Sequence, residues 1–232
     1  VTGGNNISII GNILGEDADG DSFDNVRKGI ILNNTTVTNV TIGGNQAGEP
    51  NVIRNCTEEA IYFEGVTPTG ITISQNSIGQ NGRGIVLNGG NSGILSPSIT
   101  SYSLSTVSGS GVNGDLIELF VEDGNGQGLT YLDNTTVAGS TWTITGLSLL
   151  AADRIVANAT NANGTSEFSN QIFKVTDATD NLTPPVGSLR EAIQLANSSS
   201  AIVSEIWFDL ASTSTITLAE VLPDITRPVI ID

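Results

Sequence analysis

The sequence predicts an all-β protein built from a parallel β-helix, a β-sandwich and one short capping helix. The 232 residues include 27 glycines, few aromatic residues and many Asn and Thr residues, a composition that favours strands and turns over helices. Short apolar segments also recur along the chain, which is typical of repeated structural units. We expect β-helix coils at 1–95, a sandwich at 96–175, and a capping helix with the first β-helix rungs at 176–232.

Residues 1–95 contain repeated short strands. The segments that resemble one another are ISIIGNILG at 7–15 and ITISQNSIG at 71–79, and GIILNN at 29–34, AIYFEG at 60–65 and GIVLNG at 84–89. Gly or Asn ends each strand, and the irregular spacing suits coils with variable loops. Such strands stack best as rungs of a right-handed parallel β-helix with inward ladders of Ile, Val and Leu. Asn12 and Asn76 occupy equivalent places and are predicted to be corner residues that satisfy backbone groups.

Beyond about residue 95 the strands become longer and alternate strictly between apolar and polar residues. The expected strands are LIELFV at 116–121, LTYLDN at 129–134, TWTITG at 141–146 and RIVANAT at 154–160. Their spacing favours antiparallel pairing in a small sandwich, with Phe120 and Trp142 as core anchors. The stretch 97–173, with its TVSGSG, IELFVEDGNG and ATNANGTSEFS segments, resembles bacterial Ig-like modules found in tandem on large surface proteins. That resemblance implies a spacer or adhesion module without an active site.

The third segment contains the one convincing helix, VGSLREAIQLANSSS. Ser188 is the expected N-cap, and Glu191 completes a capping box three residues later. EIWFDL, TITLAEVLPDI at 215–225 and PVIID follow as expected strands. This pattern closely resembles the segment, often named after its Ser-Leu-Arg-Glu-Ala sequence, that opens many bacterial secreted parallel β-helix proteins. The resemblance implies that the helix caps a β-helix whose first rungs come directly after it.

The two ends of the sequence look like two halves of one unit, because the cap comes first in the proteins that it resembles and last here. Joining Asp232 to Val1 gives PVIIDVTGGNNISIIGN, which reads as strand, turn and strand. An open β-helix end must be capped or paired. We therefore expect one period of a tandem array, or a subunit whose C-terminal rungs complete the next copy. A chain closed on itself is the alternative. The residues predicted to form this head-to-tail interface are Ile7, Ile9, Ile10, Ile216, Leu218, Val229, Ile230 and Ile231.

Charge and composition exclude several functional classes. Eight basic and 24 acidic residues give a net charge of −16, which repels phosphate backbones and argues against nucleic acid as a partner. No apolar run approaches the length of a membrane span. The chain has no His and a single Cys56, so it has no Cys/His nucleophile pair and no intrachain disulfide. Without an initiator Met or signal peptide, we expect a mature or excised piece of a secreted protein.

The acidic segment GEDADGDSFDN offers the one candidate metal site. Asp17, Asp19 and Asp21 resemble an oxygen-rich Ca²⁺ loop, but the terminal Glu of an EF-hand is missing. A solvated corner loop is the alternative, and no other cofactor is expected. We therefore predict an extracellular or cell-surface structural or adhesive protein, and not an enzyme. The competing hypothesis is a β-helix that binds surface glycans or cleaves them as polysaccharide lyases do, which would need clustered carboxylates with Arg or Lys on one sheet face.

Overall fold

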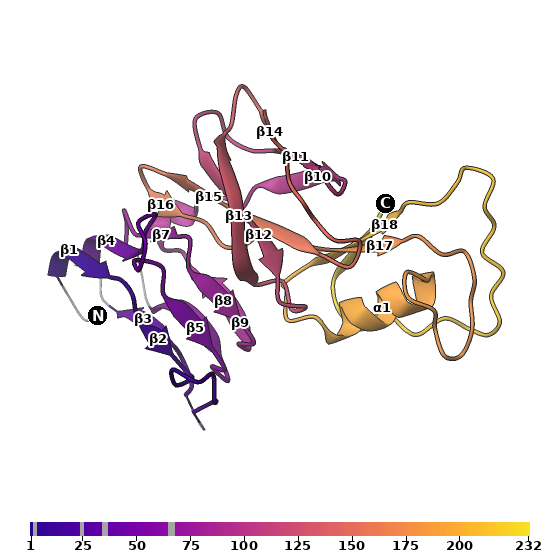
Figure 1. Ribbon diagram of the computed structural model, residues 1–232, viewed down its shortest axis with the longest axis horizontal. Coiled ribbons are helices and arrows are strands. Elements are labelled where there is room, and N and C mark those ends of the chain that lie inside the picture. Colours follow the sequence, from indigo (N-terminus) through magenta and orange to yellow (C-terminus); the bar gives the residue numbers. More distant parts are fainter. Residues whose placement is uncertain (2–3, 24–25, 34–36, 65–67) are drawn as a thin grey trace. The chain divides into compact units, whose positions relative to one another are not determined.

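The computed structural model describes residues 1, 4–23, 26–33, 37–64 and 68–232. Across these residues the protein contains nineteen strands, one α-helix and one short 3-10 helix, so the predicted all-β class is confirmed. The chain forms two compact units, Val1–Ser169 and Asn170–Asp232, and Figure 1 labels most of their strands. The finer division into three domains stays a prediction.

The first nine strands form three parallel sheets. They are β1 (Gly4–Ile9), β2 (Ile13–Leu14), β3 (Ile30–Asn33), β4 (Val37–Gly43), β5 (Val52–Arg54), β6 (Glu59–Glu64), β7 (Thr72–Ser74), β8 (Ser77–Gly79) and β9 (Arg83–Val86). The sheets have the orders β1-β4-β7, β2-β5-β8 and β3-β6-β9. The chain therefore visits the three sheets in turn and does so three times. We call each set of three successive strands a coil, so that coil 1 is β1 to β3, and the 3-10 helix Asn91–Gly93 follows coil 3.

Alternating side chains explain why these short strands stack. In β3, Ile30 and Leu32 are buried whereas Ile31 between them is exposed, as the two-residue period of a strand requires. Ile30 pairs with Ile61 of β6, and Ile61 pairs with Ile85 of β9. One ladder of isoleucines therefore runs through all three coils, and neighbouring ladders of Leu, Val, Ile and Phe complete the core.

Asparagines form a second ladder at the corner between the first two sheets. The main-chain and side-chain nitrogens of Asn12 both donate to Oδ1 of Asn51, at 2.9 Å each. Asn51 donates in the same way to Oδ1 of Asn76, at 2.9 and 2.8 Å. Asn76 donates from Nδ2 to the Ile42 carbonyl at 2.9 Å. The prediction that Asn12 and Asn76 are corner residues that satisfy backbone groups is confirmed, and Asn51 is their missing middle member.

Seven antiparallel strands follow in the first unit. One sheet contains β10 (Ser98–Tyr102), β11 (Thr106–Ser110) and β14 (Thr141–Thr145), and the other contains β13 (Gly128–Thr136), β12 (Leu116–Glu122), β15 (Ile155–Asn161) and β16 (Gly164–Thr165). Phe120 and Trp142 are almost completely buried, so their prediction as core residues is confirmed. Phe120 also meets Tyr131 and Phe168 edge to face, with ring centroids 5.7 Å apart in both pairs, a favourable aromatic geometry.

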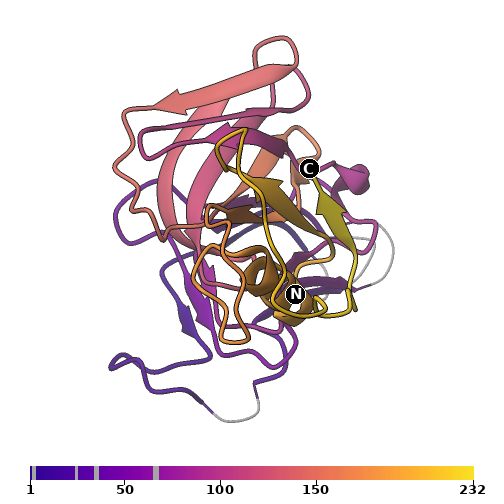
Figure 2. The ribbon, with the colours of Figure 1, turned by 90° about the vertical axis from the view of Figure 1, so that its right-hand side faces the viewer.

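The second unit combines one helix with one parallel sheet. Strands β17 (Gln171–Val175), β18 (Ser204–Phe208) and β19 (Val229–Ile231) pair in that order, and helix α1 (Leu189–Ser198) packs against β17 and β18 (Figure 2). Ser188 is the N-cap as predicted, and its Oγ accepts from the Glu191 nitrogen at 3.2 Å. The Glu191 carboxylate accepts from the Gly187 nitrogen at 2.5 Å, one residue before the nitrogen that a standard capping box uses.

The expected strand at 215–225 is wrong, because this stretch contains no strand. Its polar backbone groups bind side chains of the helical region instead. Arg190 donates to the carbonyls of Glu220 and Val221 at 2.9 and 2.8 Å, and Asn197 donates to the Asp224 carbonyl at 2.7 Å. Alternating apolar residues suggested a strand, but these contacts hold the backbone without a neighbouring strand.

Candidate functional site

The first candidate surface is the outer edge of coil 1. Strands β1, β2 and β3 are the terminal members of their three sheets, and no described strand pairs with their outer sides. Ile10 and Ile13 are 44% and 47% exposed there, whereas Ile7 and Ile9 are half-buried and pack against the core. We call this surface, made by β1, β2 and β3, the coil edge. It leaves backbone groups and apolar side chains without a strand to cover them.

Val1 shows how the coil edge accepts a further strand. Its amino nitrogen donates to the Ile31 carbonyl at 2.7 Å, and the Asn33 nitrogen donates to the Val1 carbonyl at 2.8 Å. These two bonds form the pattern of a parallel pair in which Val1 lies opposite Leu32. The Val1 side chain also packs against the core. The outer side of β3 therefore already binds one residue of a parallel strand in a defined register.

The other end of the coils, at coil 3, is covered by the antiparallel part of the same unit. Thr165 Oγ1 accepts from the Ile73 nitrogen at 2.8 Å, and Gln127 Nε2 donates to the Asn81 carbonyl at 2.6 Å. Gly164 also forms a parallel bridge with Ile71. These contacts are buried, so coil 3 has its polar groups satisfied in a way that coil 1 does not.

Glu118 is the most deeply buried of the carboxylates that bind coil 3 at this junction, the others being Asp123 and Glu167. The carboxylate accepts from Ser74 Oγ at 2.6 Å and from the Gln75 nitrogen at 3.2 Å, and it is 2% exposed. Burial raises the pKa of Glu118, although these two hydrogen bonds act in the opposite direction. The carboxylate joins β12 to the corner after β7, so its hydrogen bonds make a structural contact.

The second candidate surface is the outer side of β19. The Asp232 nitrogen donates to the Ile206 carbonyl at 3.0 Å, and the Phe208 nitrogen donates to the Asp232 carbonyl at 3.2 Å, so the pairing with β18 extends to Asp232. Within the described chain no strand lies on the other side of β19. Ile230 and Ile231 are 49% and 50% exposed. We call this outer side of β19 the β19 edge.

At the far side of the same sheet, the residues directly after β17 are paired. Thr176 and Asp177 both donate from the main chain to the Gly187 carbonyl, at 2.9 and 3.0 Å, and Asp177 bridges Ser188 in parallel fashion. Each unit therefore has one uncovered apolar end, and the first unit also has one covered sheet end.

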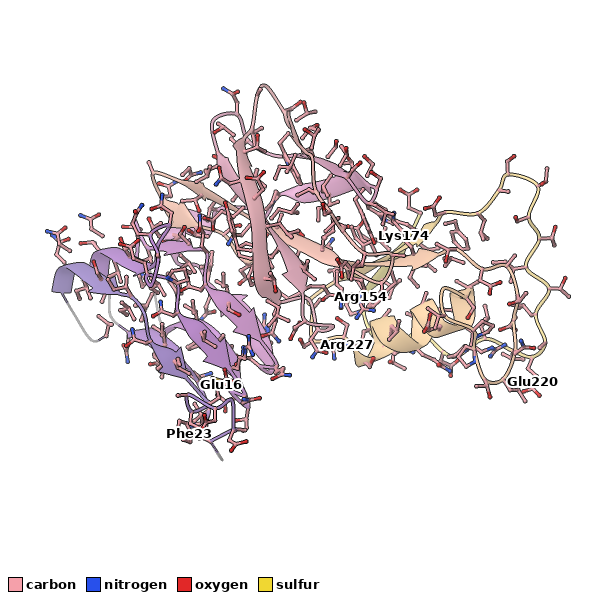
Figure 3. The ribbon with its side chains drawn as sticks, viewed as in Figure 1. Glu16, Phe23, Arg154, Lys174, Glu220 and Arg227 are labelled. Atoms are coloured by element: carbon pink, nitrogen blue, oxygen red, sulfur yellow. The ribbon has the colours of Figure 1, made fainter. Side chains whose placement is uncertain are left out.

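A buried ion pair holds the segment that leads into β19. Arg190 and Asp180 join through two hydrogen bonds of 2.6 and 2.7 Å, and Asp180 also accepts from the Ala219 nitrogen at 2.9 Å. The hydrogen bond from Arg190 holds the pKa of Asp180 below its usual range. Arg190 reaches the carbonyl of Glu220, a residue of this segment that is labelled in Figure 3. The Arg of the Ser-Leu-Arg-Glu-Ala sequence therefore organises the approach to the β19 edge.

The structure places six of the eight predicted interface residues at the two uncovered ends and the other two, Ile216 and Leu218, in the segment before β19. Ile7, Ile9 and Ile10 belong to the coil edge, and Val229, Ile230 and Ile231 to the β19 edge. Ile216 packs against the core of the second unit, and Leu218 beside it is exposed. Their role in assembly stays a prediction. Sequence reasoning missed Val1 and Ile31, because the alternation within β3 shows which residues face inward but not which neighbour a strand binds.

The acidic loop is built around one carboxylate. Asp17 Oδ1 accepts from the main-chain nitrogens of Asp19 and Asp21 at 3.0 and 2.9 Å, which closes the turn. The described residues contain no group of three or more acidic, Cys or His side chains arranged to hold a metal ion. The candidate Ca²⁺ site at Asp17, Asp19 and Asp21 stays a prediction. Asp24 of this segment lies outside the described residues.

Comparison with known proteins gives no match to a family model, to a curated protein or to a solved structure. In the described part of the chain, the single α-helix falls well short of the length and apolar character that a membrane crossing needs.

Proposed function

We propose that this chain is an extracellular structural or adhesive protein that assembles head to tail. Under this proposal coils 1 to 3 are a right-handed parallel β-helix, the antiparallel strands are an Ig-like sandwich that covers its coil 3 end, and the second unit supplies the cap and first rungs. Other copies of the chain are the partners, either as separate subunits or as covalent repeats.

The observation that carries the proposal is the presence of two uncovered apolar strand ends in one chain. The coil edge ends three parallel sheets, and the β19 edge ends a parallel sheet of the same kind. Free strand edges of this kind promote pairing with another chain unless they are blocked. The β19 edge has half-exposed Ile230 and Ile231 where a blocked edge would have Lys, Pro or a bulge. Unlike ends that bind each other form a heterologous contact, which produces rings or fibres.

The test is whether assembly depends on the ends. Sedimentation velocity and negative-stain electron microscopy of the 232-residue chain should show species that grow with concentration. The double change Ile230→Asp and Ile231→Asp places charge on both faces of β19, and at Ile231 on the inward face where the proposal requires an apolar contact, so it should leave monomers. Both side chains are about half exposed, so the fold should survive, and an unchanged circular dichroism spectrum would verify this.

A matched control changes two exposed apolar residues far from both ends in sequence. Leu104 and Leu150 are 56% and 69% exposed, and Leu104→Asp with Leu150→Asp adds the same charge. This variant should assemble as the native chain does. Filaments that persist after the change at Ile230 and Ile231, or a native chain that stays monomeric at every concentration, would contradict the proposal.

The competing function, binding or cleavage of surface glycans, also stays a prediction. Incubation with a panel of acidic polysaccharides and measurement of new reducing ends would test cleavage. Release that persists in a variant with Asp17, Asp19 and Asp21 changed to Asn would place the activity outside the acidic loop, whereas lost release would assign it there.

A further inference from the structure

We propose that β19 of a second copy is the strand that extends the coil edge beside β3, and that it binds in a single register. In this register Ile231 of one copy lies opposite Ile30 of the next, and Asp232 lies opposite Ile31. The inference rests on the head-to-tail assembly proposed above and adds the partner strand and its alignment.

The first observation that fixes the register comes from β3. Val1 lies opposite Leu32, as its two hydrogen bonds with Ile31 and Asn33 require. A parallel strand that leads into Val1 therefore places its last residue opposite Ile31 and the residue before that opposite Ile30. Ile30 is buried and Ile31 is exposed. The incoming strand must carry an inward apolar residue and then an outward residue at these two positions.

The second observation comes independently from β19. Ile231 pairs with Ile206, which is completely buried in the core of the second unit. The hydrogen bonds of Asp232 place it opposite Trp207. Ile231 therefore faces inward and Asp232 outward, which is the order that β3 requires. A shift by one residue would turn Asp232 toward the core, where an unpaired carboxylate is strongly unfavourable.

In this register the inward-facing residues of β19 in one copy and of β3 in the next form continuous ladders. One ladder contains three residues from each copy, and its members are Phe173, Ile206 and Ile231 of one copy and Ile30, Ile61 and Ile85 of the next. Where Asp232 is bonded to Val1 of the next copy, as in a covalent repeat, the adjacent ladder places that Val1 opposite Phe208. Between separate chains the Val1 amino group moves aside for the Asp232 carboxylate, since the two positions are one bond apart. Phe208 is 44% exposed in the single chain, and this contact would cover it.

Disulfide formation between two singly substituted chains tests the register. Asp232→Cys in one chain and Ile31→Cys in the other give neighbouring outward thiols, with Cα atoms about 4.8 Å apart in a parallel pair. This separation lies within the range of disulfides. Asn33→Cys is the matched control, because Asn33 faces the same way in β3. It lies two residues farther along, so its Cα would be about 8 Å from that of residue 232, too far for a disulfide.

The two mixtures are oxidised mildly under the same conditions and compared on non-reducing gels. We expect at least about tenfold more heterodimer from the Asp232→Cys and Ile31→Cys mixture, since disulfides fall off steeply with Cα separation. Each variant alone controls for Cys56, whose burial raises the pKa of its thiol and lowers its reactivity.

The outcomes separate the register from the assembly. Equal or greater crosslinking through Asn33→Cys, or no crosslinking while sedimentation still shows assembly, would overturn the register and leave the proposed function standing. A native chain that does not assemble would overturn both the register and the proposed function. A third arm carries Asp232→Cys and Ile31→Cys in one chain at high dilution. A crosslinked monomer there, without heterodimer in the mixture, would show a chain closed on itself and overturn the choice of a second copy.

Discussion

Replacement of Asn51 by Ala should destabilise the coils by far more than the same change at Asn12. The Asn51 amide takes part in four hydrogen bonds of 2.8 to 2.9 Å: two accepted from Asn12, one donated to Asn76 and one donated to the Ile9 carbonyl. Asn51 is completely buried. At a net 0.5 to 1.5 kcal/mol for each bond, with the Asn12 groups partly rehydrated, the cost is about 2–4 kcal/mol.

Hydrogen exchange measured by mass spectrometry suits this prediction, because a chain with two compact units need not unfold in one step. A loss of about 2–4 kcal/mol corresponds to about 30- to 700-fold faster exchange in peptides from coil 2, provided that they exchange by unfolding of the coils. Peptides from β17 and β18 in the second unit should be unchanged. Asn12→Ala is the control, because its exposed side chain leaves Asn51 Oδ1 bonded to the Asn12 main chain; its cost should stay below about 1 kcal/mol.

Equal acceleration by the two changes, within about threefold, would refute the reasoning, because a threefold factor is under 1 kcal/mol. It would mean that the buried hydrogen bonds of Asn51 stabilise the coils no more than the exposed hydrogen bonds of Asn12 do. Asn51→Asp gives a second check with nearly the same shape. A carboxylate cannot donate to the Ile9 carbonyl or to Asn76, so this variant should be less stable than the native chain at neutral pH. It should recover part of the loss in acid, where the protonated group can donate once.

Three other changes probe the core, the junction and the ends. Ile61→Ala, in the middle of the isoleucine ladder, should lower the free energy of unfolding of the coils by about 2–5 kcal/mol, measured by the same hydrogen exchange of coil peptides. Burial raises the pKa of Glu118, so the folded state binds its proton more tightly than the unfolded state does. The stabilisation is present below the ordinary pKa of Glu and is lost as the pH rises through the higher folded value. Glu118→Gln should therefore melt progressively higher, relative to the native chain, as the pH rises from the ordinary pKa of Glu through the raised folded value. A fusion of two copies with Asp232 joined directly to Val1 should melt higher than one with a single inserted Gly, because one extra residue turns the strand over.

Sequence patterns revealed coils 1 and 3 because their corners are alike. Ile9, Ile42 and Ile73 are successive neighbours in one sheet, and Asn12 and Asn76 each follow their isoleucine by three residues. Asn51 follows Ile42 by nine residues. The longer corner hides its equivalence from any fixed spacing, although the ladder brings the three side chains together. A search that allowed insertions between the strand and the asparagine would have found it.

The failure at 215–225 has a different cause. Its alternating apolar residues are those of a strand, but strand formation also needs a neighbour that offers backbone partners. In this chain those partners are side chains, namely Arg190, Asn197 and Asp180. Arg190 and Asp180 are distant from the segment in sequence, so no residue pattern within 215–225 predicts the contact. The same limit applies to the register at the coil edge, which depends on two hydrogen bonds of Val1.

The difference between covered and uncovered ends also gives the proposed assembly a direction. Coil 3 is covered by groups such as Gln127 and Thr165, whose hydrogen bonds suit only the antiparallel part of this unit. The coil edge and the β19 edge are unlike each other, so a contact between them is heterologous and each added copy leaves the same two ends free. Growth should therefore stop only where an end is blocked. A chain with Ile230→Asp and Ile231→Asp keeps an intact coil edge, so it can join the β19 end of a fibre but cannot be joined in turn. In substoichiometric amounts it should shorten native fibres in proportion to its share of the mixture, whereas the Leu104→Asp and Leu150→Asp control should leave their length unchanged. Fibres of unchanged length in both mixtures would contradict growth by addition at unlike ends.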